Sequence, residues 1–400
     1  MKVKKITIRK VLDSRGKYTA EVDVFSERTS GRFTSPSGAS KGAYEAMDYP
    51  GNSIDQGIKM FNSTVAPKFT GKEFADITEV DSALHEVDSS SNFSKLGGNV
   101  AIAVSLSLLN AFAGEAQTPL YRFLLKDAKV TMPKPESNII GGGKHAIGGT
   151  TIQEFMSVAF GKSFLESISS NVRVHEKVRE ALLKRFKDIP IGLGDEKAWV
   201  APLPDTEAMQ VLADAIKEVS EQNGVKILPA IDFAASSFYK GASYVYKDRS
   251  LSRDEQIAFI TDLAKKYNLC LIEDPLEKND YEGHATVTKA LKGKSIIIGD
   301  DLFVTNKKRF EKGIEIGSCS GILIKPNQIG TFTDMLETVK LAKKNKYATV
   351  LSHRSGDTED NTVSHLAVGL GMDYVKFGTI GGERTAKHNE LIRIEEEANA

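Results

Sequence analysis

The chain has 400 residues, of which 40% are hydrophobic and 26% charged, and its 53 basic side chains balance its 53 acidic ones. This balance gives no reason to expect a nucleic acid or an anionic membrane as partner, and no apolar run is long enough to span a bilayer. The two cysteines, Cys270 and Cys319, lack the spacing of a metal site or of a disulfide framework. We therefore expect buried free thiols in a cytoplasmic protein.

The first third of the chain predicts an α+β unit. Alternating apolar residues and glycine-containing turns predict three short strands within the first 46 residues. Apolar residues and alanines crowd the segment from Asn99 to Ala116, which predicts a buried helix. Strands followed by helices form an α+β domain, which we assign to residues 1–128.

From residue 129 to residue 400, apolar strands alternate with amphipathic helices. The spacing between strands suits βαβ crossovers and therefore a parallel sheet. No convincing glycine-rich phosphate turn favours a doubly wound open sheet, so we predict an α/β fold of the β/α-barrel type. Polar residues at the carboxyl ends of barrel strands meet at one mouth, where catalysis takes place. The later strands place these residues there: Asp232, Glu273, Asp300, Lys325, His353 and Lys376.

The carboxylates Asp232, Glu273 and Asp300 predict a cation site at this mouth. At about 5 Å apart, each pair would repel by roughly 3 kcal/mol at an effective dielectric near 20. Protons or a cation must relieve this repulsion, and oxygen-only ligands favour magnesium or manganese. A single acid at such a position is more often a helix cap or a solvated loop end. Lys325 either extends to solvent or points into the mouth, where a nearby dication would help it to lose a proton.

The chain resembles the enolase family from Ile8 to Glu397, in the order and spacing of its motifs. The motifs are VLDSRG, PSGAS, GGGKHA, QEFM, GDE, IEDP, GDDLFVTN, LIKPNQIG, SHRSGDTED, ERTAKHN and LIRIEEE. The resemblance implies an enolase-type β/α-barrel preceded by an N-terminal α+β domain. It also implies a lyase of glycolysis and gluconeogenesis that reversibly dehydrates 2-phosphoglycerate to phosphoenolpyruvate.

The resemblance also assigns the metal and the catalytic residues by position. Asp232, Glu273 and Asp300 would hold a first magnesium ion. Ser40 would reach a second one, which gives two Mg²⁺ per active site with substrate bound. Lys325 would take the proton from carbon 2, and Glu196 would protonate the departing hydroxyl. Glu154 is its partner carboxylate, expected to raise the proton affinity of Glu196.

Further residues resemble the family's substrate contacts. His145, Arg354 and Ser355 would surround the substrate and its phosphate, His353 and Lys376 would add contacts, and Asp301 would help to orient the metal loop. Lys376 would lie near the substrate carboxylate. Without the resemblance, Ser40 reads as a helix cap, His145 as a turn residue, and the glutamates as surface acids.

Some positions differ from the residues that are usual in the family. Lys197-Ala198-Trp199 follow Glu196 in place of Gly-Gly-Phe, and the charge of Lys197 would favour an ionised Glu196. This leaves two alternatives open: a catalytically silent homologue that binds other molecules, or an acid-sugar dehydratase of the enolase superfamily. The pair Arg354-Ser355 favours a phosphate ligand over the second. A homodimer or an octamer is expected, because Glu21 and Arg393 resemble residues that pair across the family's dimer interface.

Overall fold

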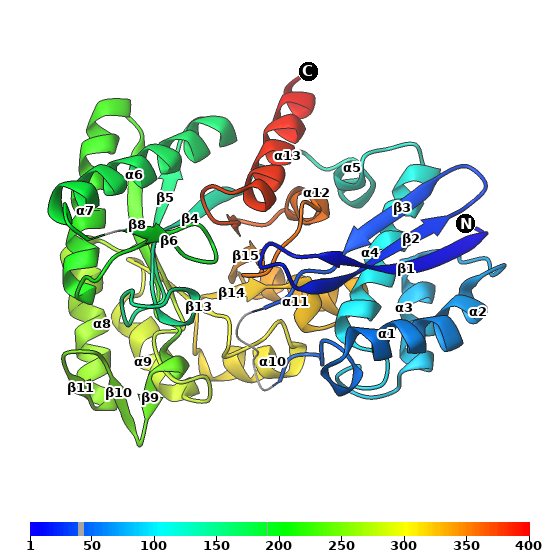
Figure 1. Ribbon diagram of the computed structural model, residues 1–400, viewed down its shortest axis with the longest axis horizontal. Helices are drawn as coiled ribbons and strands as arrows, with labels where there is room; N and C mark the ends of the chain where they lie inside the picture. Colours follow the sequence, from blue (N-terminus) through cyan, green and yellow to red (C-terminus); the bar gives the residue numbers. More distant parts are fainter. Residues whose placement is uncertain (39–43, 190) are drawn as a thin grey trace.

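The computed structural model describes residues 1–38, 44–189 and 191–400. Figure 1 shows an N-terminal α+β part packed against one side of a large barrel. Helices join the two parts, because α5 (Leu120–Leu125) packs on α12 (Thr362–Gly369) and α3 (Ile77–Val87) packs on α11 (Phe332–Lys344). Ser40 lies outside the described residues, so its expected role as a metal ligand stays a prediction. None of the helices in the described ranges has the length and apolar character needed to cross a membrane.

The N-terminal part confirms the three strands and the buried helix. Strands β1, β2 and β3 form an antiparallel sheet, and α4 packs across β2 and β3. Gly31 on β3 allows this approach, since a Cβ atom there would lie 2.0 Å from the carbonyl oxygen of Ser107. The bounds are β1 Lys5–Leu12, β2 Tyr18–Phe25, β3 Ser30–Thr34, α1 Ile54–Met60, α2 Ala66–Phe69, α3 Ile77–Val87, α4 Gly98–Glu115 and α5 Leu120–Leu125, with a π-helical turn at Phe61–Val65.

The second part is a closed barrel. Within the described ranges, eight strands follow one another in the order β4-β5-β8-β12-β13-β14-β15-β16, and β16 pairs back onto β4. The strands are β4 Lys134–Gly141, β5 Glu154–Phe160, β8 Lys226–Asp232, β12 Leu271–Glu273, β13 Ile296–Gly299, β14 Gly321–Ile324, β15 Ala348–Ser352 and β16 Tyr374–Lys376. The predicted fold class is confirmed.

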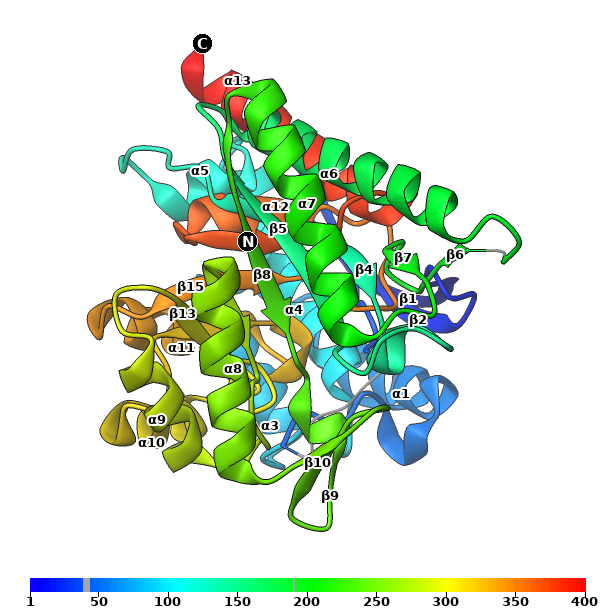
Figure 2. The same cartoon turned by 90° about the vertical axis from the view of Figure 1, so that its left-hand side faces the viewer.

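Helices surround the barrel, as Figure 2 shows for α6, α7 and α8. They are α6 Phe164–Arg185, α7 Asp205–Asn223, α8 Arg253–Tyr267, α9 Tyr281–Ala290, α10 Lys307–Ile316, α11 Phe332–Lys344, α12 Thr362–Gly369 and α13 Gly382–Asn399. Two further groups of short strands lie in the loops of the described ranges. A hairpin consists of β6 Gly192–Leu193 and β7 Trp199–Val200, and a three-stranded antiparallel sheet consists of β9 Tyr239–Lys240, β10 Ser243–Val245 and β11 Ser250–Leu251.

The expectation of a wholly parallel sheet is wrong at β5. This strand runs antiparallel to both β4 and β8. The reason is the connection: a short excursion at residues 142–153 joins β4 to β5, and both α6 and α7 come after β5. Because β5 starts at the mouth and runs away from it, its first residue, Glu154, lies level with Asp232 at the end of β8.

Below the mouth, the barrel is filled with side chains. Seven buried apolar residues form a separate cluster: Met156, Val158, Ala230, Leu271, Ile298, Leu323 and Val350. A filled barrel keeps the strand ends rigid, so the chemistry is confined to the mouth. The predicted strand-end residues lie there. Asp232, Glu273 and Lys376 are the last residues of their strands, and Asp300, Lys325 and His353 directly follow theirs.

Candidate active site

One small cavity at the mouth gathers most of the residues that the sequence singled out. Asp301 is not among the described residues that line it. The lining includes His145, Glu154, Glu196, Asp232, Glu273, Asp300, Lys325, His353, Arg354, Ser355 and Lys376. Gly38 also lines the cavity, and it comes from the N-terminal part.

Lys376 neutralises the carboxylates on its side of the mouth. Its buried ammonium Nζ lies 3.1 Å from Asp232 Oδ2, 2.8 Å from Glu273 Oε2 and 3.4 Å from Glu154 Oε1. Burial alone would lower the pKa of Lys376, but these carboxylates hold it well above the usual value. Lys376 is therefore charged in this structure.

Lys325 neutralises the carboxylate of Asp300. Its Nζ lies 2.5 Å from Asp300 Oδ2, and Gln328 Nε2 donates to Asp300 Oδ1 over 3.1 Å. The backbone N–H groups of Asp300 and Asp301 both donate to Asp274, over 3.0 and 2.6 Å. Burial and the neighbouring Asp301 raise the pKa of Asp274 well above its usual value. No role was predicted for Gln328 or Asp274 from the sequence, although both lie in quoted motifs.

The three predicted metal-binding carboxylates, Asp232, Glu273 and Asp300, all line the cavity, but each of them pairs with one of two lysines, Lys325 or Lys376. Asp232 and Glu273 bind Lys376, whereas oxygens of Asp300 lie within 4.8 Å of those of Asp274 and Asp301. Burial, and then Asp232, raise the pKa of Glu273 well above its usual value. Buried oxygen-only donors that repel one another fit a hard dication, so this donor set suits Mg²⁺.

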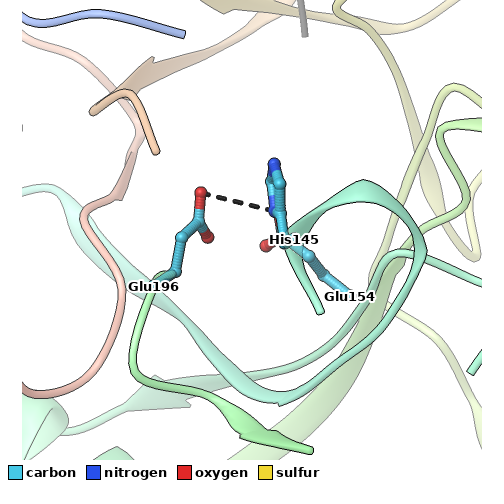
Figure 3. A group of neighbouring side chains, drawn as sticks. All are labelled: His145, Glu154 and Glu196. Atoms are coloured by element: carbon cyan, nitrogen blue, oxygen red, sulfur yellow. Dashed lines mark ion pairs between the residues drawn. The ribbon is translucent and has the colours of Figure 1, made fainter. Parts of the chain in front are cut away.

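A second cluster at the mouth consists of His145, Glu154 and Glu196 (Figure 3). His145 Nδ1 is 3.5 Å from Glu154 Oε1 and 3.5 Å from Glu196 Oε1. On the other side of Glu196, His353 Nε2 is 3.5 Å from Oε2, and Asn138 donates to the same oxygen over 3.2 Å.

The protonation of this pair differs from the expectation. Burial and then Glu196 raise the pKa of Glu154. Burial would raise the pKa of Glu196 as well, but His145 and His353 hold it well below its usual value. The structure therefore favours the proton on Glu154, because the two imidazoles flank Glu196. These two directions do not support the expectation that Glu154 raises the proton affinity of Glu196, and that role stays a prediction.

The unusual loop after Glu196 is anchored on α6. Lys197 adopts a positive φ of 61°, and its carbonyl accepts a hydrogen bond from His175 Nε2 over 2.9 Å. Trp199 Nε1 donates to the carbonyl oxygen of His175 over 3.0 Å. After burial, the strongest influences on the pKa of Glu196 are the two histidines, so Lys197 is not the charge that sets it.

Arg354 connects the barrel to the N-terminal part. Its Nη1 donates to Asn327 Oδ1 over 2.7 Å, and its Nη2 lies 3.1 Å from Glu45 Oε2. Nearby, Ser37 and Gly356 exchange backbone hydrogen bonds of 2.7 and 2.9 Å. The segment that leads toward Ser40 is thus held against the mouth. Sequence reasoning missed Glu45 and Asn327, because neither lies at the end of a strand.

Comparisons with known proteins agree with this architecture. The family model "Enolase, N-terminal domain" matches residues 3–124, and "Enolase, C-terminal TIM barrel domain" matches residues 129–400. An enolase of Picrophilus torridus is 46% identical, covering 99% of this chain and 98% of its own. An enolase of Thermoplasma acidophilum is 45% identical, covering 98% of each chain. An enolase of Methanothermobacter thermautotrophicus is 42% identical, covering 99% of this chain and 96% of its own.

Proposed function

This chain belongs to the enolase family, and we propose that the side chains gathered at its barrel mouth carry out the family's reaction in defined roles. The reaction is the reversible dehydration of 2-phosphoglycerate to phosphoenolpyruvate. The observation that supports the roles best is the convergence of Lys325, the metal-type carboxylates and the Glu154–His145–Glu196 group on one cavity.

Lys325 is the proposed base. It follows β14 directly, and its Nζ lies on the side of the cavity occupied by Asp300. In the structure, burial opposes its charge, but Asp300 raises the pKa of Lys325. Lys325 must give up this proton before it can accept the one on carbon 2. Lys376, at the end of β16, would then offset the charge that develops beside the substrate carboxylate.

Asp232, Glu273 and Asp300 would hold the first Mg²⁺ of the family, and Ser40 a second one when substrate is bound. The metal supplies electrostatic stabilisation of the negative charge that builds up on the deprotonated substrate. Binding of Mg²⁺ by these carboxylates requires that they give up their ion pairs with Lys325 and Lys376. Asp301, beside Asp300, would orient this loop through its hydrogen bond to Asp274.

The Glu154–His145–Glu196 group would supply the proton for the leaving hydroxyl. Glu154 would store this proton, because burial and then Glu196 raise its pKa and so favour its protonated form. Glu196 would deliver a proton that Glu154 has first passed to it through His145, which lies 3.5 Å from an oxygen of each carboxylate. Arg354 and Ser355 would bind the phosphate, and His353 would hold Glu196 in place.

Turnover by the purified, magnesium-loaded protein tests these roles. We expect phosphoenolpyruvate to form from 2-phosphoglycerate, and Lys325→Ala to reduce the rate by at least about a thousandfold. Lys307→Ala is the matched control, since Lys307 is exposed on α10 and pairs with Glu337. An inactive wild-type protein that is folded and metal-loaded, or a Lys325→Ala variant with normal turnover, would refute the assignment.

The comparisons favour neither alternative reading of the sequence. A silent homologue would bind magnesium without turnover, and an acid-sugar dehydratase would prefer substrates without phosphate. A substrate screen separates the three functions.

We further propose a domain boundary at residues 128/129, a cytoplasmic location and a homodimeric or octameric assembly. Glu21 and Arg393 would pair between subunits. Within the chain, Arg393 is exposed on α13 and pairs with Glu390. Sedimentation of the wild type and of Arg393→Ala tests the assembly.

A further inference from the structure

The first turns of α13 bury three basic side chains behind the mouth. Arg384, Lys387 and His388 are 0%, 1% and 3% exposed. Charged side chains are rarely buried so completely unless they have partners. Their partners lie mainly in the segment 353–358, which is the first part of the connection from β15 to α12 and contains Arg354 and Ser355.

Arg384 holds the backbone of the two residues that would bind the phosphate. Its Nη1 donates to the carbonyl oxygen of Arg354 over 2.8 Å, and its Nη2 donates to that of Ser355 over 2.9 Å. Nη1 also lies 3.5 Å from Asp357 Oδ2. The planar guanidinium has a fixed arrangement of donors, so one side chain fixes two consecutive carbonyl groups relative to each other.

Lys387 completes this attachment one turn further along α13. Its Nζ donates to Asp357 Oδ1 and to the carbonyl oxygen of Thr358, each over 2.9 Å. The segment is irregular, and the N–H groups of Ser37 and Ser14 bond the carbonyl groups of Gly356 and Asp357. The α13 side chains add hydrogen bonds to the carbonyl groups of Arg354, Ser355 and Thr358, since buried carbonyl groups require partners.

We propose that Arg384 is a positioning residue for the phosphate site: by fixing the carbonyl groups of Arg354 and Ser355, it aims both side chains at a phosphate in the cavity. This rests on the proposed function. Arg384 itself does not line the cavity among the described residues, so it acts through Arg354 and Ser355. Its charge also acts on the acid cluster: burial and then Arg384 lower the pKa of His353, and Arg384 lowers that of Glu196 after the two histidines.

Two substitutions separate positioning from charge. Arg384→Lys keeps the charge, but an ammonium replaces the fork that spans both carbonyl groups. Arg384→Met removes both the charge and the guanidinium fork. Arg249→Lys is the control, because Arg249 stacks on Phe259 and Tyr246 and is not among the described residues that line the cavity. Circular dichroism and thermal unfolding show which variants are folded. If Arg384→Met does not fold, Arg384→Lys alone still tests the proposal.

Binding of inorganic phosphate to the magnesium-loaded protein, measured by calorimetry, is the primary readout. We expect at least a tenfold weaker affinity for both Arg384 variants and an unchanged affinity for Arg249→Lys. The KM for 2-phosphoglycerate should rise in parallel, while kcat for Arg384→Lys stays within about threefold of the wild type. This split between KM and kcat distinguishes positioning from a general loss of structure.

The pH dependence of kcat provides a second readout. Its acidic limb should move to higher pH in Arg384→Met and stay in place in Arg384→Lys. The ionisable groups around Arg384 are His353, Asp357, Glu196, Glu383, Lys387 and His388.

Unchanged phosphate affinity in folded Arg384→Lys, or an equal loss in Arg249→Lys, overturns the proposal. A wild type that binds phosphate but does not turn over would instead refute the proposed function. The calorimetric comparison therefore keeps the two failures apart.

Discussion

Replacing Glu136 with a neutral residue should stabilise the metal-free protein, and more so at alkaline pH. Glu136 lies on β4 inside the barrel, is 0% exposed, and neither of its oxygens has a hydrogen-bond partner among the described residues. Burial raises its pKa from the ordinary 4.5 to about 8, although Lys376 opposes this rise. The folded protein therefore binds this proton more tightly than the unfolded chain does.

The size of the effect follows from proton linkage. With a folded pKa of about 8, Glu136 contributes no penalty well below pH 4.5, and its full penalty appears as the pH rises through 8. The penalty amounts to about 2 kcal/mol at pH 6 and about 5 kcal/mol at pH 9. The stability gap between Glu136→Gln and the wild type should therefore widen by about 3 kcal/mol over this range. Glu136→Met should gain more, because it also removes an unpartnered polar group.

Urea unfolding of the metal-free proteins at pH 6 and pH 9 measures this gap. The only tryptophan, Trp199, provides a fluorescence signal from the barrel. Coincidence with circular dichroism checks that the transition is two-state. If the wild type and Glu136→Gln show the same dependence on pH, then Glu136 does not titrate in the folded barrel and the reasoning is wrong.

Two more predictions concern stability. Gly31→Ala should lower the free energy of unfolding by about 1–3 kcal/mol, because the added methyl group would overlap the backbone of α4. Gly192→Ala is the control and should be nearly neutral, because a Cβ atom there meets no described atom within 4 Å. Equal melting temperatures of the two variants would contradict this prediction. His85 on α3 and Asp334 on α11 form a 2.9 Å ion pair, which raises the pKa of His85 above 6.5 and, despite burial, lowers that of Asp334 below 3.8. The pair stabilises most between about pH 4 and pH 6.5 and fades as the pH rises through the raised pKa of His85, so His85→Gln should lower the melting temperature at pH 6 and not at pH 9.

The residues at the mouth could be predicted from the sequence where an apolar strand ends in a polar residue or is followed by one. Asp232, Glu273, Lys325 and Lys376 all lie where this pattern places them. It could not predict that β5 runs backwards, because a short connection between two apolar strands looks the same before the pairing is known. Hence Glu154 was recognised by resemblance and not by pattern.

Residues that act from behind the mouth were also missed. Arg384 and Asp357 meet only through the packing of α13 against the segment after β15. Basic residues at buried positions of a helix are a possible signal, but the sequence does not show which face of α13 is buried. The protonation of Glu196 likewise depends on two histidines from distant loops, His145 and His353, which only the fold brings together.

Hydrogen exchange at carbon 2 of 2-phosphoglycerate tests the central claim, that Lys325 removes the proton. In D₂O with Mg²⁺, Glu196→Gln should still exchange this hydrogen while its dehydration is lost, because the base is intact. Lys325→Ala should bind the substrate and exchange nothing. Exchange at a wild-type rate by folded Lys325→Ala would contradict the mechanism.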